Sequence, residues 1–264
     1  MDFPRRASLR ATFEEVPELY DRVRPTYPPE LFDDLAELAD LSEGARLLEI
    51  GTGPGKASVP LAERGYEIVG IELGERLAGL ARRNLAGFPN VEIVNADFET
   101  WEPAAPGFDA VVSFTAFHWI DPEVRYEKTA RLLREGGSLA IVETSHVLPE
   151  GGDPFWIEVQ ADYREVFPDD EAHRPPLPED VAGMSAELEA SGRFGRAEVR
   201  RYLWDVTYSA EDYIGVLETY SGHRATDLEV RERLYDLIRG RIDARPEREV
   251  RKSYLALMTV ARRR

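Results

Sequence analysis

Residues 45–55 read ARLLEIGTGPG, an apolar segment that runs directly into three glycines at alternate positions, Gly51, Gly53 and Gly55. The apolar segment is typical of a short buried strand. The glycines let the backbone turn tightly and approach a ligand without a Cβ atom in the way. A helix after such a turn presents free N–H groups that suit a carboxylate or a phosphate. The segment therefore predicts a strand, a ligand-binding turn and a helix, in that order.

The alternation of strand and helix continues along the chain. Four more apolar segments predict strands, at 67–73, 91–96, 108–114 and 138–143, the last after the pair Gly136 and Gly137. Helical patterns lie between them at 75–86 and 124–134. Two later strands are predicted at 196–208 and 253–260, with helices between them at 210–220 and 227–242. This order predicts parallel strands that are joined by right-handed crossovers and covered by helices.

The segments outside this alternation are less regular. The first 26 residues are irregular and charged, and Pro28 and Pro29 then predict the start of a helix that ends at Gly44. Residues 149–178 lose their periodicity among glycines, prolines and charges, which predicts an insertion with a helix at 155–166. We expect one domain with four parts: an amino-terminal segment (1–44), a core (45–148), an insertion or lid (149–195) and a carboxyl-terminal part (196–264).

The composition argues against several classes of protein. The chain has 33 Lys and Arg against 50 Asp and Glu, a formal charge of −17, which disfavours a nucleic acid or an anionic membrane as partner. Cysteine is absent, so disulfides and thiolate chemistry are excluded and a cytoplasmic location is expected. No apolar stretch is long enough for a membrane span, and no apolar run follows Arg5, Arg6 and Arg10 as a secretory signal requires. The four histidines, at 118, 146, 173 and 223, lack metal-ligand spacing, so we expect no metal.

Acidic residues stand at the ends of the first three predicted strands. Glu49 lies just before the glycine turn, Glu72 follows about 20 residues after it, where a carboxylate can bond the hydroxyls of a ribose, and Asp97 ends the next strand. Because the carboxyl ends of parallel strands meet at one edge, these three acids should converge there. A dinucleotide-dependent dehydrogenase is the competing interpretation, but Lys56 stands where its Gly-x-Gly-x-x-Gly pattern needs the third glycine.

In their order, these motifs resemble class I S-adenosylmethionine-dependent methyltransferases, especially the small-molecule branch of ubiquinone/menaquinone-biosynthesis and trans-aconitate methyltransferase-like proteins. The resembling segments are LLEIGTGPGKAS (47–58), IVGIEL (68–73), VEIVNADFETW (91–101), FDAVVSFTAFHWID (108–121) and LLREGGSLAIVE (132–143). The resemblance implies an α/β, doubly wound, Rossmann-like fold with a seven-stranded, mostly parallel sheet. The last strand would be antiparallel, helices would cover both faces, and the irregular segment would be a helical insertion.

The resemblance also implies a cofactor, S-adenosyl-L-methionine, with S-adenosyl-L-homocysteine as its product. The implied cofactor-binding residues are Tyr20, Arg24, Glu49, Gly51, Thr52, Gly53, Gly55, Glu72, Leu73, Asp97, Phe98 and Thr115. In this set the glycine turn above Glu49 would hold the methionine part, and Glu72 would bind the ribose beside Leu73. Asp97 and Phe98 would hold the adenine, and Thr115 would lie near the sulfonium. Tyr20 and Arg24 belong to a segment that covers the cofactor in this branch.

Acceptor residues are expected in two segments. His118 and Trp119 follow the fourth strand, where His118 would act as a base or orient the acceptor and Trp119 would face the acceptor or the sulfonium. Tyr220, His223 and Arg224 form the second set of substrate contacts that we expect. A base is needed only where the acceptor must lose a proton. The expected partner is a small molecule, and the chain would be a monomer or a homodimer.

Two alternatives to methyl transfer stay open. An aminopropyltransferase-like enzyme would use the same sheet with decarboxylated S-adenosylmethionine, but it needs acids at its amine pocket, and only Asp121 follows Trp119. A catalytically silent module would bind S-adenosylmethionine and act by interaction. Turnover of a methyl acceptor separates these alternatives from the main prediction.

Overall fold

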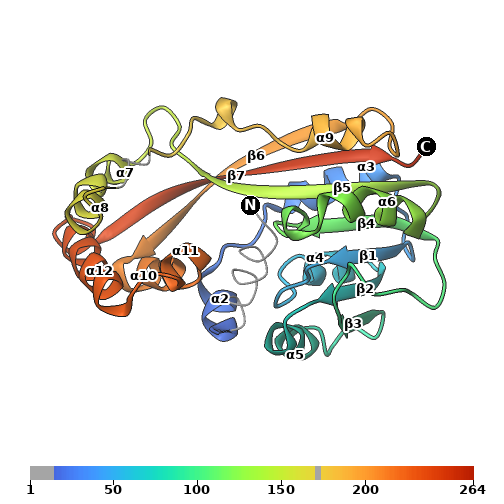
Figure 1. The fold of residues 1–264 in the computed structure, drawn as a ribbon, viewed down its shortest axis with the longest axis horizontal. Coiled ribbons are helices and arrows are strands. Elements are labelled where there is room, and N and C mark those ends of the chain that lie inside the picture. Colours follow the sequence, from blue (N-terminus) through green and yellow to red (C-terminus); the bar gives the residue numbers. More distant parts are fainter. Residues whose placement is uncertain (1–14, 170–173) are drawn as a thin grey trace. The chain divides into compact units, whose positions relative to one another are not determined.

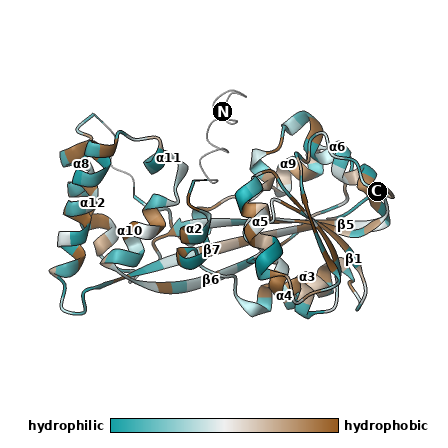
Figure 2. Cartoon of the chain, turned by 90° about the horizontal axis from the view of Figure 1, so that it is seen from below, coloured by the Kyte–Doolittle hydropathy of each residue, from teal (hydrophilic) through white to brown (hydrophobic). Residues whose placement is uncertain are grey.

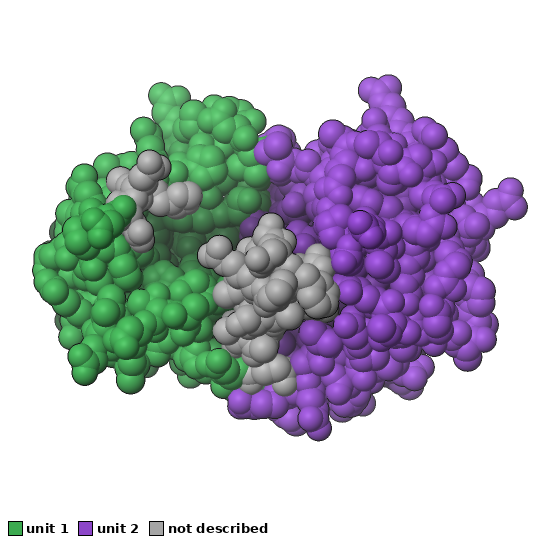
Figure 3. All heavy atoms as spheres, viewed as in Figure 1, with its two compact units in different colours: residues 1–25, 145–181, 203–255 green, residues 26–144, 182–202, 256–264 purple. Residues whose placement is uncertain are grey.

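The computed structural model describes residues 15–169 and 174–264, so Arg5, Arg6, Arg10 and His173 lie outside the described residues. The chain divides into two compact units, each made of several segments (Figure 3). Unit 1 takes its residues from 1–25, 145–181 and 203–255. Unit 2 takes its residues from 26–144, 182–202 and 256–264.

A seven-stranded sheet has the strand order β3-β2-β1-β4-β5-β7-β6 (Figure 1). Its strands are β1 (Arg46–Ile50), β2 (Glu67–Glu72), β3 (Val91–Asn95), β4 (Phe108–Phe114), β5 (Leu133–Val147), β6 (Glu198–Ser209) and β7 (Glu249–Arg262). The pairs β3–β2, β2–β1, β1–β4 and β4–β5 are parallel. An antiparallel bridge joins Phe194, just before β6, to Arg263, just after β7, so β7 runs against its neighbour. The predicted seven-stranded sheet with an antiparallel last strand is confirmed.

Unit 2 packs helices on both faces of its part of the sheet, as expected. Its helices are α3 (Pro29–Ala39), α4 (Ser58–Glu63), α5 (Glu75–Asn84), α6 (Pro122–Leu132) and α9 (Ser185–Ala190), with a 3₁₀ turn, η2, at Phe117–Trp119. Figure 2 shows α3 and α4 on one side of the apolar strands and α6 and α9 on the other. The central strands β1 and β4 contribute Leu48 and Val111 to the core, both without exposed surface. Burial on two faces explains why these strands are continuous apolar runs.

Unit 1 has an apolar cluster of its own, which includes Phe155, Val216 and Ile238. Its helices are α2 (Pro17–Val23), α7 (Phe155–Glu158), α8 (Gln160–Val166), η3 (Pro178–Asp180), α10 (Ala210–Glu218), α11 (Ser221–Arg224) and α12 (Leu228–Asp243). The helix expected at 155–166 is present as the successive pieces α7 and α8. Arg241 of α12 pairs with the buried Asp162 of α8 through two hydrogen bonds of 2.6 Å.

The structure corrects three details of the expected elements. Helix α2 forms within the first 26 residues, for which the sequence predicts an irregular segment. Helix α3 ends at Ala39, and the residue that caps it is Asp40, whose φ of 55° is left-handed, and not Gly44. Asp tolerates this conformation better than most residues, and the chain can therefore leave the helix four residues earlier.

The third correction concerns Gly136 and Gly137, which lie inside β5 rather than before it. The pairing of β5 with β4 shifts its register between Phe108 and Ala110. A Cβ atom on Gly137 would stand 3.0 Å from the carbonyl oxygens of Phe108 and Asp109. The glycine therefore permits a close approach of two strands rather than marking a turn.

Over the described ranges, no helix combines the length and the apolar character that a bilayer span requires.

Candidate active site

The glycine turn follows β1 and is held from three sides. Gly51 donates its N–H to the carbonyl of Ile71 at 2.8 Å, and the side chain of Asn84 donates to the carbonyl of Pro54 at 2.9 Å. Gly51 has a φ of 73°, and a Cβ atom there would stand 2.3 Å from the Cβ atom of Ala116. Only glycine fits this position, because the segment after β4 packs directly on the turn.

Glu72 ends β2 and joins the glycine turn to the β2–α5 connection. Its buried carboxylate accepts the N–H of Gly53 at 2.8 Å and the N–H of Gly74 at 2.9 Å. Asn95 of β3 supports the same corner, because its side chain donates to the carbonyls of Glu72 and Leu73 at 3.0 and 2.9 Å. The side chain of Leu73 is 43% exposed. An anchored acid therefore stands beside an apolar side chain that is open to a ligand.

Glu49 lies beneath the turn and is almost fully buried. Its carboxyl accepts a hydrogen bond of 2.6 Å from the hydroxyl of Ser58, at the start of α4. The pKa of Glu49 is raised to about 8, mainly because burial disfavours the charged carboxylate; the Ser58 hydrogen bond lowers this pKa and the nearby charge of Glu72 raises it. The carboxyl is therefore mostly protonated at neutral pH and acts as a structural support of the turn.

Thr52 and Gly55 complete the turn without reaching outward. Thr52 turns its side chain toward β2, where a Cβ atom on Gly70 would stand 2.6 Å from the Thr52 hydroxyl. Gly55 has a φ of 95° and faces Leu85. These residues can contribute only their backbone to a ligand, which is what the resemblance implied. Gly70 is a support that the sequence analysis missed, because a glycine inside a strand gives no signal of what packs on it.

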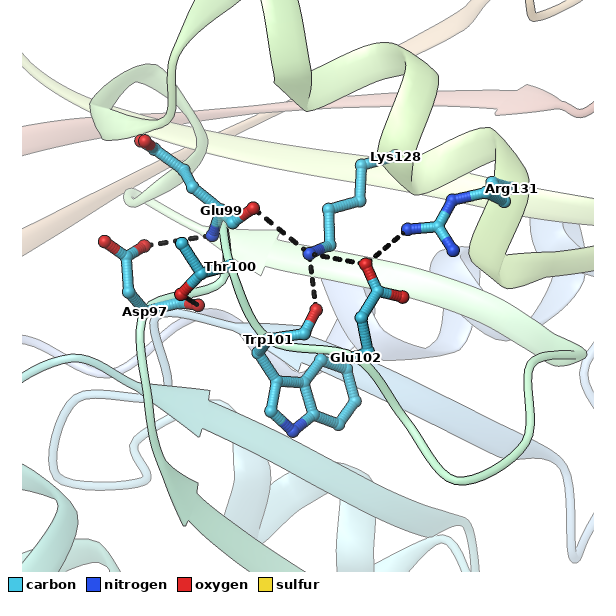
Figure 4. Close-up of polar contacts among 7 residues, drawn as sticks. All are labelled: Asp97, Glu99, Thr100, Trp101, Glu102, Lys128 and Arg131. Carbon is cyan, nitrogen blue, oxygen red and sulfur yellow. Dashed lines mark hydrogen bonds and ion pairs between the residues drawn. The ribbon is translucent and has the colours of Figure 1, made fainter.

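Asp97 follows β3 and organises a tight turn over residues 97–102 (Figure 4). Its carboxylate accepts the N–H of Glu99 at 2.9 Å, and its carbonyl accepts the N–H of Trp101 at 2.8 Å. Phe98 is buried in the core of unit 2, with the ammonium of Lys128 5.3 Å from its ring centroid. The side chain of Phe98 is thus packed inward rather than open to a ligand.

Thr115 follows β4 in a conformation that is rare for a β-branched residue, with a φ of 58°. Its hydroxyl lies 3.2 Å from the hydroxyl of Tyr27 and 3.3 Å from that of Thr144, on β5. Left-handed backbone at such a residue is strained and concentrates at functional positions. These hydroxyl contacts of Thr115 add Tyr27 and Thr144 to the candidate site residues. The sequence prediction names neither of them as a site residue.

His118 and Trp119 lie in η2, directly after Thr115 and Ala116. Their ring centroids are 5.0 Å apart, and the outer surface of His118 is exposed. The protein atoms on its inner side desolvate the imidazole and lower its pKa, and the positive charge of Arg125 lowers it further. His118 is therefore mainly neutral at pH 7 and able to accept a proton.

The remaining predicted residues lie in unit 1 and are grouped there. Arg24 donates to the hydroxyl of Thr219 at 2.7 Å, and its guanidinium lies over the rings of Tyr20 and Tyr220. His223 lies 3.3 Å from the hydroxyl of Tyr163, and burial lowers its pKa to about 4. Arg224 forms ion pairs with Glu15 and Glu218.

The structure therefore gathers the predicted residues into two sets. The glycine turn, the three acids and the residues after β4 meet at the carboxyl edge of β1 to β4 in unit 2, while Tyr20, Arg24, Tyr220, His223 and Arg224 meet in unit 1. A surface hollow of unit 1, lined by Arg239, Asp243 and Arg248 among others, contains none of them. Within residues 15–169 and 174–264, no three His, Cys, Asp or Glu side chains are grouped to hold a metal ion.

Comparison with known families gives a match for the core. Residues 47–137 match the family described as a methyltransferase domain. This segment contains the glycine turn, Glu72, Asp97, Thr115 and His118, so the match covers the set of residues found in unit 2.

Curated relatives match a longer part of the chain. An uncharacterized methyltransferase of Mycobacterium tuberculosis is 30% identical over 56% of this chain and 63% of its own length. A demethylmenaquinone methyltransferase of Clavibacter sepedonicus is 33% identical over 52% of this chain and 58% of its own length. The match thus spans about three fifths of the length of these relatives.

Solved structures share the fold. A type II methyltransferase candidate from Anaeromyxobacter dehalogenans has a TM-score of 0.61 and 22% identity, over 90% of this chain and 97% of its own. A phosphoethanolamine N-methyltransferase of Haemonchus contortus, in complex with S-adenosylhomocysteine, has a TM-score of 0.51 and 15% identity, over 96% of this chain and 57% of its own. At these identities the likeness concerns the fold, which is the Rossmann-like fold that the sequence predicted.

Proposed function

We propose that this chain, which carries a class I methyltransferase domain, transfers a methyl group from S-adenosylmethionine to a small-molecule acceptor. The observation that carries the proposal is the position of Glu72. Its carboxylate is fixed at the end of β2 by the N–H groups of Gly53 and Gly74, beside the exposed Leu73. A carboxylate has about four acceptor positions, so an anchored one can still accept from the hydroxyls of a ribose.

The glycine turn fits a ligand that approaches the backbone closely. A Cβ atom on Gly53 would meet no other atom within 4 Å, so the space above this glycine is open. Gly51 and Gly53 both have a positive φ, which turns their peptide groups in a way that residues with side chains rarely allow. The absence of a side chain at Gly53 therefore leaves room for the methionine part of the cofactor, next to Glu72, which would hold the ribose.

Each part of the set then has a task. Glu72 would bind the ribose, Leu73 would pack on the adenine, and Asp97 would accept a hydrogen bond from the adenine amino group. When bound, S-adenosylmethionine supplies a methyl group on a positively charged sulfur, so the protein has chiefly to orient the acceptor and to exclude water. His118 and Trp119 would contact the acceptor, and the neutral imidazole of His118 would take a proton from an acidic acceptor.

The acceptor class is a small molecule, for which the likeness to a demethylmenaquinone methyltransferase gives support. The charge of −17 also disfavours an anionic polymer as acceptor. Tyr20 and Arg24 would cover the cofactor, and Tyr220, His223 and Arg224 would contact the acceptor. The expected location is the cytoplasm.

Calorimetry with S-adenosylhomocysteine tests the cofactor. We expect binding by the wild-type chain and a loss of about 10-fold or more in affinity for Glu72→Gln, because the amide cannot accept two ribose hydroxyls while facing two N–H donors. Glu75→Gln, three residues later on α5, is the matched control and should bind like the wild type. Binding of NADH in place of S-adenosylhomocysteine, or equal affinity in both variants, would contradict the proposal.

A second experiment separates an enzyme from a silent binding module. The protein is incubated with labelled S-adenosylmethionine and a pooled extract of small molecules, and the extract is searched by mass spectrometry for a methylated product. Methylation of an acceptor supports the proposal. A parallel incubation supplies decarboxylated S-adenosylmethionine. Transfer of its aminopropyl group, or binding of the cofactor without any transfer, would support one of the two alternatives instead.

A further inference from the structure

Lys128 is a buried cation whose contacts the proposed function does not use. It lies on α6 with 5% of its surface exposed. Its ammonium donates to the carbonyl of Glu99 at 3.3 Å and to the carbonyl of Trp101, and it lies 3.4 Å from a carboxylate oxygen of Glu102 (Figure 4). Burying a lysine is costly unless its charge is satisfied, so these contacts must offset a real penalty.

All three contacts are made with the turn that Asp97 begins. The Asp97 carboxylate holds the N–H of Glu99, and the Asp97 carbonyl holds the N–H of Trp101. No helix follows this turn whose N–H groups could donate to the carbonyls of Glu99 and Trp101. Lys128 supplies the donor instead. The turn at 97–102 is thus held at its start by Asp97 and at its end by Lys128.

The same turn is tied to the segment that carries His118 and Trp119. A carboxylate oxygen of Glu99 accepts the N–H of Asp121 at 3.0 Å, and Asp121 in turn caps α6 by accepting the N–H of Glu123 at 2.9 Å. Lys128 lies about two helical turns beyond this cap. Helix α6 therefore connects the turn after β3 to the turn after β4 at two points, through Asp121 and through Lys128.

We propose that Lys128 is a positioning residue for recognition of the adenine amino group: it fixes the 97–102 turn so that the Asp97 carboxylate keeps its place. This inference rests on the proposed function, because it assigns Asp97 to the cofactor. The Asp97 carboxylate already holds one N–H of its own turn, so its orientation follows that of the turn. Without Lys128 the carbonyls of Glu99 and Trp101 lose a donor, and the turn can relax away from the sheet edge.

Arg131 provides a matched control on the same helix. It pairs with the same Glu102 carboxylate at 2.6 Å, but from an exposed position. Arg131→Met therefore removes an equal charge and an ion pair with Glu102 while leaving Lys128 on the two carbonyls. Glu102→Gln is a second control, because it weakens the ion pair of Lys128 and keeps both carbonyl contacts.

The test compares S-adenosylhomocysteine with its inosine counterpart, in which an oxygen replaces the amino group that Asp97 would accept from. We expect the wild type to prefer the adenine compound by about 100-fold, because the oxygen of the inosine compound cannot donate a hydrogen bond to the Asp97 carboxylate. Lys128→Met should lose most of this preference by binding the adenine compound at least about 10-fold more weakly, with the inosine affinity within about 3-fold of wild type. Arg131→Met and Glu102→Gln should keep the wild-type preference.

Three results would overturn the inference while leaving the proposed function intact. These are an unchanged preference in Lys128→Met, a preference lost equally in Arg131→Met, or an equal loss of affinity for both compounds, which is what a purely structural role would produce. Lys128→Gln retains an uncharged amide NH2 group that can donate to the carbonyls, so it should give an intermediate preference. It replaces Lys128→Met if circular dichroism shows that the Met variant is unfolded. Failure of the wild type to bind S-adenosylhomocysteine would overturn the proposed function, and this inference with it.

Discussion

Glu49 is the residue whose protonation should be visible in the stability of the fold. Its pKa is about 8 in the folded chain against an ordinary value of 4.5, so the folded state keeps a proton that the unfolded state releases between these values. Stability should therefore fall as pH rises from 4.5 to 8, by at most about 1.4 kcal/mol per pH unit. Urea unfolding at several pH values should show this fall in the wild type and its loss in Glu49→Gln. Glu63→Gln, an exposed change on α4, should keep the wild-type slope, and equal slopes in all three proteins would refute the assignment.

His118 makes a prediction about the pH dependence of turnover. Its pKa lies below the ordinary 6.5, because desolvation and Arg125 both disfavour the charged imidazole. If His118 takes a proton from the acceptor, kcat/KM should be constant near neutrality and fall only as pH drops through this lowered pKa. His118→Asn should reduce kcat by about 100-fold or more and remove that acidic limb. A variant with wild-type kcat and an unchanged profile would mean that His118 orients the acceptor or only packs against Trp119.

The place of a site residue could be predicted from the sequence where its immediate neighbours in the chain decide it. It could not be predicted where contacts with distant segments decide it. Glu72 and Asp97 each end an apolar strand, and this position alone predicts that they lie at the sheet edge. Lys128 and Asn95 give no such signal, because a lysine on a helix or a polar residue in a strand is ordinarily solvated. The burial of Lys128 and the hydrogen bonds of both residues depend on which segments pack against them.

At the level of elements, the pair of helices α8 and α12 depends on one buried acid. Asp162 is held by two hydrogen bonds from Arg241, while Arg239 on the same helix forms an exposed ion pair with Asp236. Arg241→Met should lower the free energy of unfolding by about 3 kcal/mol, because it leaves a buried carboxylate unpaired. Arg239→Met should change it by less than about 1 kcal/mol. Chemical denaturation measures both, and similar effects of the two substitutions would contradict this account of the helix pair.

The strands are easier to predict than the short helices for a physical reason. An apolar run of five to seven residues with a glycine beside it is visible without knowing its neighbours, as in β1, which Gly51 follows, and β4, which Gly107 precedes. Helices α2 and α9 have seven and six residues, too few turns for a periodic pattern. Gly136 and Gly137 resemble a boundary because a glycine that allows two strands to approach looks the same in the sequence as one that makes a turn.

At the scale of the whole molecule, hydrogen exchange can assign the cofactor to one unit or to both. S-adenosylhomocysteine should slow the exchange of amides at 51–55, 72–74 and 97–101 in unit 2. If Tyr20 and Arg24 cover the cofactor as proposed, amides at 20–24 in unit 1 should be slowed as well. Mass spectrometry of peptic fragments measures both sets. Slowing in unit 2 alone would remove Tyr20 and Arg24 from the site, and slowing in neither would contradict the choice of cofactor.

The interleaving of the two units has a consequence for how the protein is made. The chain passes between the units after residues 25, 144, 181, 202 and 255, and the last segment of unit 2 is 256–264. A ribosome therefore finishes the sequence of unit 1 before it supplies the end of β7 that unit 2 needs. The glycine turn and its acids, although translated early, wait for those final residues before their sheet is complete. Until then the nascent chain exposes unpaired strand edges, which are a site of aggregation during synthesis.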